Sequence, residues 1–178
     1  MTDEIRQRMV EFLPRLRRFA YVLTGDSDRG DDLVQETCAR ALSRLDQFEP
    51  GTRLDSWMFR IAQTQWFDRM RAQKIRGEVF DLDTAENIAG EDGRRVTESR
   101  LTLSKVCEGI ARLPPEQQML IALIAVDGLS YKEAAEILEI PVGTVMSRLA
   151  RARLYLYRFS ADADTSTTKA ESHRGRAD

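Results

Sequence analysis

Apolar residues recur every three or four positions along three stretches in the first half of the chain. These stretches cover residues 5–23, 33–45 and 57–77. A period of three to four residues places one apolar stripe on an α-helix, whereas a half-buried strand needs strict alternation. No alternation of useful length occurs in the sequence, so we predict an all-α fold.

Several residues mark where these helices are expected to begin, bend or end. Pro14 should kink the first helix or restart it, because proline lacks the amide hydrogen that a helix interior needs. The run from Thr24 to Ser27 combines a helix stop with a new cap. Ser56 is expected to cap the third helix, which would then begin at Trp57.

Apolar periodicity stops after Gly77 and resumes near residue 101. The stretch between them is acidic and has no sustained period, so we predict a linker there. Helical patterns then cover residues 101–113 and 115–124, with a Pro-Pro pair at the boundary between them. An Asp-Gly pair is expected to close the second of these helices.

Residues 129–153 carry the most informative pattern of the chain, two helices joined by a tight turn. Ser130 followed three residues later by Glu133 forms a capping box, which defines the start of the first helix. Pro141 disfavours helical geometry in the residue before it and so ends that helix. Thr144 is placed to cap a second helix whose apolar stripe leaves arginines on the opposite side. This pattern is typical of a helix-turn-helix that binds the DNA major groove, although an ordinary helical hairpin with solvated arginines would look similar.

These patterns divide the chain into two helical domains and two segments without an apolar face. We predict a first domain over residues 1–77, a flexible acidic linker over 78–99 and a second domain over 100–159. Residues 160–178 offer almost nothing to bury and are predicted to be disordered. The predicted fold is therefore all-α, with two small helical domains on a flexible tether.

Charge is distributed unevenly, although the formal net charge of the 178 residues is only −2. Residues 1–77 carry 14 Lys and Arg against 12 Asp and Glu, and residues 100–159 carry 8 against 6, so each domain has a net charge of +2. Residues 78–99 carry 2 against 7, for a net charge of −5. Two mildly basic domains thus flank an acidic connector, and each domain suits a polyanion better than the chain's overall charge suggests.

The sequence gives little support to an enzyme, a metal site or a membrane protein. No run approaches 18 consecutive apolar residues and no signal peptide is visible, so we expect a cytoplasmic protein without membrane insertion. The only histidine, His173, lies in the polar tail, which leaves no Cys/His cluster for a metal. Cys38 and Cys107 fall on apolar stripes and are expected to be buried free thiols. Neither a glycine-rich phosphate loop nor a nucleophile-and-base pattern is present, so we expect no catalytic residue, cofactor or small-molecule substrate.

Three segments, in this order, resemble an extracytoplasmic-function (ECF) sigma factor, the smallest class of bacterial sigma factor. Residues 31–37 (DDLVQET) resemble the family's polymerase-binding helix. Residues 57–62 (WMFRIA), followed by Asp68 and Arg71, resemble its promoter −10 segment. The third segment resembles the family's −35-reading domain. It contains three short motifs, LPPEQ at residues 113–117, GLSY at 128–131 and PVGTV at 141–145.

The first of these segments suits a basic protein surface as its partner. Asp32, Gln35 and Glu36 lie opposite the apolar stripe of their predicted helix, and a face of carboxylates and amides favours orientation and fast encounter. The resemblance implies that the partner is core RNA polymerase. The residues it implies in this contact are Asp31, Asp32, Leu33, Val34, Gln35 and Glu36. A solvated acidic face without a partner is the alternative.

The helix that begins near Trp57 is apolar on more than one side, so it is either buried all round or reserves one side for a ligand. Hydrogen-bonding groups lie between its aromatic residues, a mixture suited to the capture of unpaired bases. The resemblance implies that this helix and the preceding loop, residues 50–55, bind the non-template strand of the −10 element. The residues it implies are Arg53, Gln63, Thr64, Asp68 and Arg71. Trp57 and Ile61 are expected in the core.

The resemblance also implies that the second helix of the helix-turn-helix reads the duplex −35 element. The residues it implies are Gly143, Thr144, Met146, Ser147, Arg148 and Arg151. Backbone N–H groups at the start of such a helix can hold a phosphate. Met146 stands where relatives often carry Arg, so an apolar contact is expected to replace one hydrogen bond to a base.

The function implied is promoter-specific transcription initiation, in which the protein binds core RNA polymerase and recognises −10 and −35 elements of promoter DNA. An anti-sigma factor is implied as a further partner. Two alternatives stay open, a free-standing helix-turn-helix regulator and a sigma mimic that sequesters an anti-sigma factor. The regulator would need a dimerisation surface and the mimic usually carries a receiver-like α/β domain, and neither is visible in the sequence.

Overall fold

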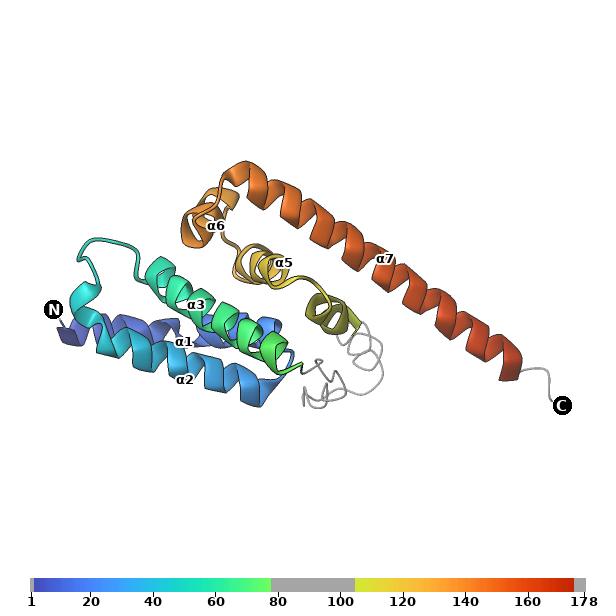
Figure 1. The fold of residues 1–178 in the computed structure, drawn as a ribbon, viewed down its shortest axis with the longest axis horizontal. Coiled ribbons are helices and arrows are strands. Elements are labelled where there is room, and N and C mark those ends of the chain that lie inside the picture. Colours follow the sequence, from blue (N-terminus) through green and yellow to red (C-terminus); the bar gives the residue numbers. More distant parts are fainter. Residues whose placement is uncertain (1, 78–104, 175–178) are drawn as a thin grey trace.

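The computed structural model describes residues 2–77 and 105–174, and every regular element in these two ranges is helical, which confirms the predicted all-α class (Figure 1). The elements of the first range are α1 (Thr2–Thr24), α2 (Ser27–Ser43), the 3-10 turn η1 (Leu45–Gln47) and α3 (Leu54–Arg76). The second range opens with a helical segment at 105–111. It continues with α5 (Pro115–Leu120), the π-helical turn η3 (Ile121–Val126), α6 (Tyr131–Leu138) and α7 (Val142–Arg174).

Local capping signals place several helix ends where the sequence predicts them. Gly25 takes a left-handed φ of +66° after α1, and the Asp26 side chain then accepts a hydrogen bond from the Arg29 amide at 2.7 Å. Gly77 ends α3 with a φ of +69°. These conformations suit glycine because it has no Cβ to clash with the backbone. The predicted capping box at the start of α6 is also present.

One of the two outcomes predicted at Pro14, a restart of the helix, is wrong, and so is the predicted start of α3. Helix α1 runs through Pro14 without a restart. One missing backbone hydrogen bond is tolerated here because Phe12 and Leu16, on either side of the proline, are both buried in the core. Helix α3 begins at Leu54 instead of Trp57, so Ser56 lies inside the first turn and does not cap it.

The start and the end of α7 also differ from the prediction. The amides of Thr144 and Val145 donate to the Pro141 carbonyl at 2.9 and 3.2 Å, so Thr144 lies in the first turn and is not the cap. The helix continues to Arg174, past the point where the sequence predicts disorder. Extending a helix that already exists adds one hydrogen bond per residue without a new nucleation cost. The predicted linker, residues 78–99, lies outside the described residues.

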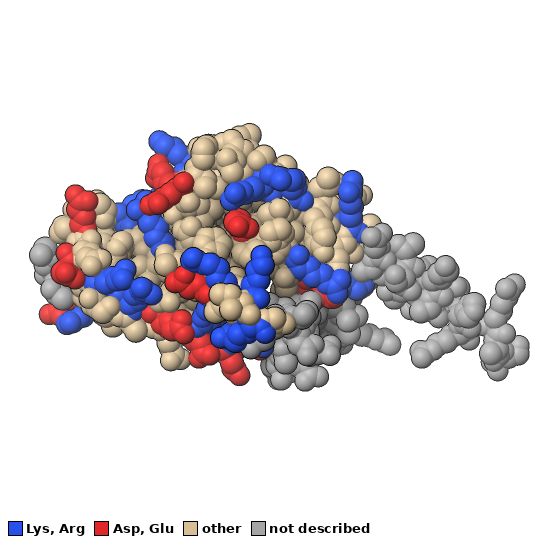
Figure 2. All heavy atoms as spheres, in the orientation of Figure 1, with Lys and Arg blue, Asp and Glu red and all other residues tan. Residues whose placement is uncertain are grey.

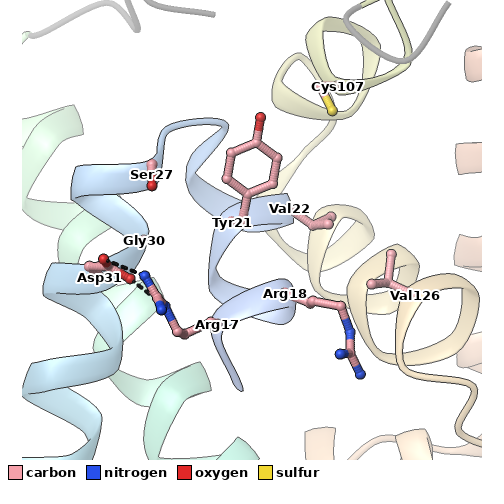
Figure 3. Close-up of a pocket in the computed structure, with 9 residues that line it drawn as sticks. All are labelled: Arg17, Arg18, Tyr21, Val22, Ser27, Gly30, Asp31, Cys107 and Val126. Carbon is pink, nitrogen blue, oxygen red and sulfur yellow. Dashed lines mark hydrogen bonds and ion pairs between the residues drawn. The ribbon is translucent and has the colours of Figure 1, made fainter. Parts of the chain in front are cut away.

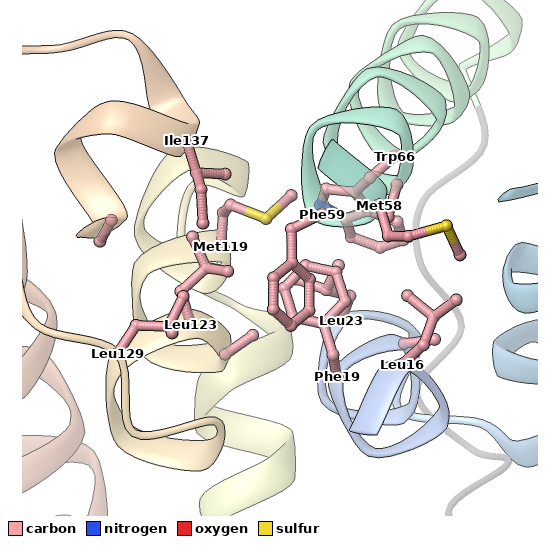
Figure 4. Close-up of a cluster of buried hydrophobic side chains, with 14 of the residues drawn as sticks. Leu16, Phe19, Leu23, Met58, Phe59, Trp66, Met119, Leu123, Leu129 and Ile137 are labelled. Atoms are coloured by element: carbon pink, nitrogen blue, oxygen red, sulfur yellow. The ribbon is translucent and has the colours of Figure 1, made fainter. Parts of the chain in front are cut away.

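Buried side chains from both halves of the chain belong to one hydrophobic core (Figure 4). Phe59 of α3 lies at its centre, with its ring centroid 5.0 Å from that of Phe12 and 4.8 Å from that of Phe19. Met119 and Ile137, from the second half, are fully buried in the same core. Helix α1 contacts η3, and α3 contacts α6. The described halves are therefore packed against each other instead of standing apart.

Candidate nucleic-acid and protein interfaces

The acidic segment lies in the first half of α2, which packs against both α1 and α3. Leu33 and Val34 are only 0% and 7% exposed, so they anchor α2 in the core. Their contact with polymerase stays a prediction, and it would involve at most the small exposed part of Val34. Asp32, Gln35 and Glu36 are exposed, because they lie on the opposite side of the same helix.

Two carboxylates of this segment are already bound within the first half of the chain. Asp31 accepts two hydrogen bonds of 2.8 Å from the Arg17 guanidinium (Figure 3). Glu36 pairs with Arg69 of α3 at 2.8 Å, and Gln65 donates to the Glu36 carbonyl at 3.3 Å. A basic partner would compete with these arginines, whereas Asp32 and Gln35 are directly accessible.

The residues expected to capture −10 DNA lie on one exposed side of α3. Thr64, Asp68 and Arg71 are exposed and Gln63 is half-buried. Arg71 pairs with Asp68 at 2.7 Å, so two of the predicted residues contact each other. The hydrogen-bonding side chains of this face are thus accessible to a ligand.

The aromatic residues of α3 mostly face inward. Ile61 is buried, as expected, and Trp66 is only 1% exposed. Trp57 is half-buried, with its ring centroid 5.3 Å from that of Phe48. The core therefore accounts for most of the second apolar side of this helix.

The groove beside this face has a second wall that sequence reasoning missed. A pocket of about 340 Å³ is lined by Gln63, Thr64 and Arg71 of α3 together with Ile137 and Glu139. The latter two lie in and just after α6, the first helix of the helix-turn-helix. No local signal in the sequence pairs these segments.

The guanidinium of Arg53, in the loop before α3, forms ion pairs with two carboxylates. It pairs with Asp55 at 2.7 Å and also with Glu133 of α6. The hydrogen bond from Arg53 lowers the pKa of Asp55. Hydrogen bonds from Ser130, followed by the one from Arg53, lower the pKa of Glu133 to about 2. Both carboxylates are consequently charged at neutral pH, and the pairs are ionic.

The residues expected to read the −35 element lie along the first turns of α7. Met146 is 54% exposed, Gly143, Ser147 and Arg151 are exposed, and Thr144 and Arg148 are half-buried. The Arg151 side chain donates to the Ser147 carbonyl at 3.3 Å. The opposite side of the helix is buried and holds α7 against the rest of the second half. The buried residues there are Val145, Leu149 and Ala152.

A largely apolar pocket of about 450 Å³ lies between the two halves, with Tyr21 and Val22 of α1 on one side and Cys107 and Val126 on the other (Figure 3). Burial raises the pKa of Tyr21 and of Cys107. Both cysteines are free and half-buried, and burial also raises the pKa of Cys38. Within the described ranges no group of acidic, His or Cys side chains could hold a metal ion. No described helix is long and apolar enough to cross a bilayer.

Basic and acidic side chains are interspersed over the face shown in Figure 2, without a continuous basic patch. Non-specific DNA binding depends on the number of phosphates that a protein neutralises at once.

Comparison with known proteins identifies the family. The family described as "Sigma-70, region 4" matches residues 108–156, and the one described as "Sigma2 domain of PhyR" matches residues 9–63. The ECF RNA polymerase sigma factor EcfG of Rhodopseudomonas palustris is 37% identical over 155 residues, which span 86% of this chain and 83% of that protein. The chain belongs to the ECF sigma factors. It is thus a sigma factor that directs transcription initiation.

Further relatives support the same family assignment. The ECF sigma-E factor of Escherichia coli K12 is 37% identical over 142 residues, covering 75% of this chain and 73% of that one. The sigma factor RpoE in complex with the anti-sigma factor NepR, from Bartonella quintana, superposes with a TM-score of 0.70 at 31% identity, covering 88% and 96% of the two chains. CnrH in complex with the cytosolic domain of CnrY superposes with a TM-score of 0.67 at 27% identity, covering 92% and 91%.

Proposed function

We propose that this sigma factor uses three separate helix faces to direct core RNA polymerase to its promoters. The exposed acidic face of α2 binds the polymerase, α3 with the loop before it captures the −10 strand, and the start of α7 reads the −35 duplex. The observation that supports this assignment is that each face is exposed while the opposite side of the same helix is buried. Copurification with core polymerase, followed by runoff transcription from a matched promoter, tests it.

The mechanism that we propose needs no catalytic residue and no nucleotide hydrolysis. Each unstacked base costs a few kcal/mol, and capture of unpaired bases by polar and apolar groups on α3 offsets that cost. Meanwhile α7 positions the complex by contacts to phosphates and base edges of the −35 duplex. The protein would act in the cytoplasm, where its polymerase and promoters lie.

We propose in addition that an anti-sigma factor binds this protein. Two structural neighbours, RpoE and CnrH, were solved with the anti-sigma factor NepR and with the cytosolic domain of CnrY. The apolar pocket between the two halves offers a surface on which such a partner could contact both at once.

The charge-reversing substitution Asp32→Lys is expected to weaken binding to core polymerase about tenfold, because it places a cation against a basic surface. Asp32 is exposed, so helix content by circular dichroism should not change. The matched control is Asp3→Lys, which makes the same charge change at a side chain that is 96% exposed on α1. Equal affinities of the two variants for core would show that the acidic face of α2 is only solvated surface.

The substitution Arg148→Ala is expected to weaken binding to the −35 element by about 1–3 kcal/mol, because a guanidinium can bond guanine or phosphate. Initiation that depends on the −35 element should fall as a result. Runoff transcription from promoters with intact and scrambled −35 elements measures the effect. Arg158→Ala serves as the control, since Arg158 is exposed further along the same helix. Unchanged −35 selectivity in the Arg148 variant would remove this residue from the reading face.

A further inference from the structure

The methionines of the chain differ sharply in their exposure. Met58 and Met119 are fully buried, and Met9 is only 5% exposed. Met70 is half-buried and packs against the core. Met146 is 54% exposed, the largest value among the methionines that the structure describes. Its thioether is therefore the most accessible of these sulfurs to a dissolved reagent.

The surface around Met146 is open. Gly143 lies three residues earlier on the same side of α7, and a Cβ added there would meet no neighbouring atom within 4 Å. Ser147, the next residue, is exposed too. The buried side of the helix, which includes Leu149, is held in the core and fixes which side faces solvent.

An accessible thioether can be oxidised by a peroxide without any other group taking part. The sulfur lone pair attacks one peroxide oxygen, so that a sulfur–oxygen bond forms while the oxygen–oxygen bond breaks. The sulfur loses two electrons to the peroxide. The departing hydroxide takes the proton of the transferred hydroxyl group and leaves as water. The product is methionine sulfoxide, which is polar and chiral.

Oxidation would change the chemistry of the −35 reading face exactly where an apolar contact is expected. A thioether can contact a thymine methyl, whereas a sulfoxide oxygen accepts hydrogen bonds and is disfavoured against a methyl group. The side chain stays uncharged in both states, so contacts to phosphates are not directly affected. The expected result is a weaker and altered readout of the −35 bases.

We propose that Met146 is an oxidant-sensitive residue of the −35 reading face, which peroxide converts to methionine sulfoxide and a methionine sulfoxide reductase restores. The inference rests on the proposed role of α7 in −35 recognition. Repair consumes two thiols, which form a disulfide, and releases the sulfoxide oxygen as water. Because the sulfoxide forms as two epimers, both reductase classes are needed for full repair. Oxidation thus switches −35-dependent initiation down, and the reductases switch it back.

The test treats the full chain with hydrogen peroxide and then with dithiothreitol, which reverses thiol oxidation at Cys38 and Cys107 but leaves sulfoxides in place. Peptide mass spectrometry should find Met146 oxidised about tenfold faster than Met58 or Met119. Holoenzyme assembled from the treated protein should make about fivefold less runoff RNA from a promoter that depends on its −35 element. Both reductases together should restore the wild-type level.

The decisive variant is Met146→Leu, because leucine is similar in size and has no sulfur. Whatever its own activity, this variant should have the same activity before and after peroxide. The matched control is Met70→Leu, which removes a half-buried thioether of α3 and should stay as sensitive as the wild type. Met146→Gln places a polar side chain of similar length there and should reproduce the loss without peroxide.

Three outcomes would overturn the proposal. They are an oxidation rate at Met146 no higher than at the buried methionines, an equal loss of activity in Met146→Leu and the wild type, and recovery with dithiothreitol alone. The last would assign the effect to a cysteine.

Untreated protein separates this inference from the function on which it rests. If scrambling the −35 element does not change runoff by the untreated wild-type holoenzyme, the proposed −35 recognition fails. If that dependence is normal and oxidation of Met146 leaves it unchanged, only the proposed modification is refuted.

Discussion

Replacement of Phe59 by alanine is expected to lower the free energy of unfolding by about 3–5 kcal/mol. Phe59 is fully buried in α3, and its ring lies against the rings of Phe12 and Phe19 at 5.0 and 4.8 Å. Truncation would remove both aromatic contacts and leave a cavity that the surrounding helices can only partly fill. Urea denaturation followed by circular dichroism measures the loss.

Val10→Ala provides the control for this effect, because Val10 is 59% exposed on α1 and its truncation should change the free energy of unfolding by no more than about 0.5 kcal/mol. Runoff transcription by Phe59→Ala should fall together with its folded fraction, since α3 carries the proposed −10 residues. A loss below about 1 kcal/mol would mean that Phe59 does not support the core as its burial indicates.

Leu149→Ala is expected to lower the free energy of unfolding by about 2–5 kcal/mol. Leu149 is 1% exposed and lies in the buried stripe that holds α7 against the rest of the second half. Its loss would loosen the helix that carries the proposed −35 residues, so −35-dependent initiation should fall as well. Thermal and urea denaturation, with runoff from promoters that need the −35 element, measure the two effects.

Met146→Ala separates stability from DNA contact on the same helix. Met146 lies three residues before Leu149 but is 54% exposed, so truncation should leave the free energy of unfolding within about 0.5 kcal/mol. It should nevertheless change the preference among −35 sequences, because an apolar side chain can contact a thymine methyl. Similar stability losses in the two variants would show that the two sides of α7 are not distinct.

Local signals in the sequence predicted the helices well where a cap or a glycine defined the end. The capping box at Ser130 and the left-handed turns at Gly25 and Gly77 depend only on neighbouring residues. The sequence places the starts of α3 and α7 too late, because a serine or threonine in the first turn resembles a cap in sequence. Backbone hydrogen bonds, and not residue type, distinguish the two positions.

The candidate interfaces could be located from the sequence only as helix faces. The resemblance to the family assigns the three binding segments to residues that form α2, α3 and α7. Periodicity correctly places Asp32 on the exposed side of α2. A motif match alone does not distinguish buried members such as Leu33 and Val34 from exposed ones. Nor could it show that Arg53 meets Glu133, because the two residues are 80 positions apart.

The sequence by itself determined that this protein is helical, which side of most helices faces inward, and which family it belongs to. These properties follow from residues within a few positions of each other, through the helical period, the caps and short motifs. Only the tertiary structure decided that the two halves pack against each other in one core and that α6 contacts α3. The pair between Arg15 and Asp127 joins residues 112 positions apart, and no local pattern specifies a contact at that separation.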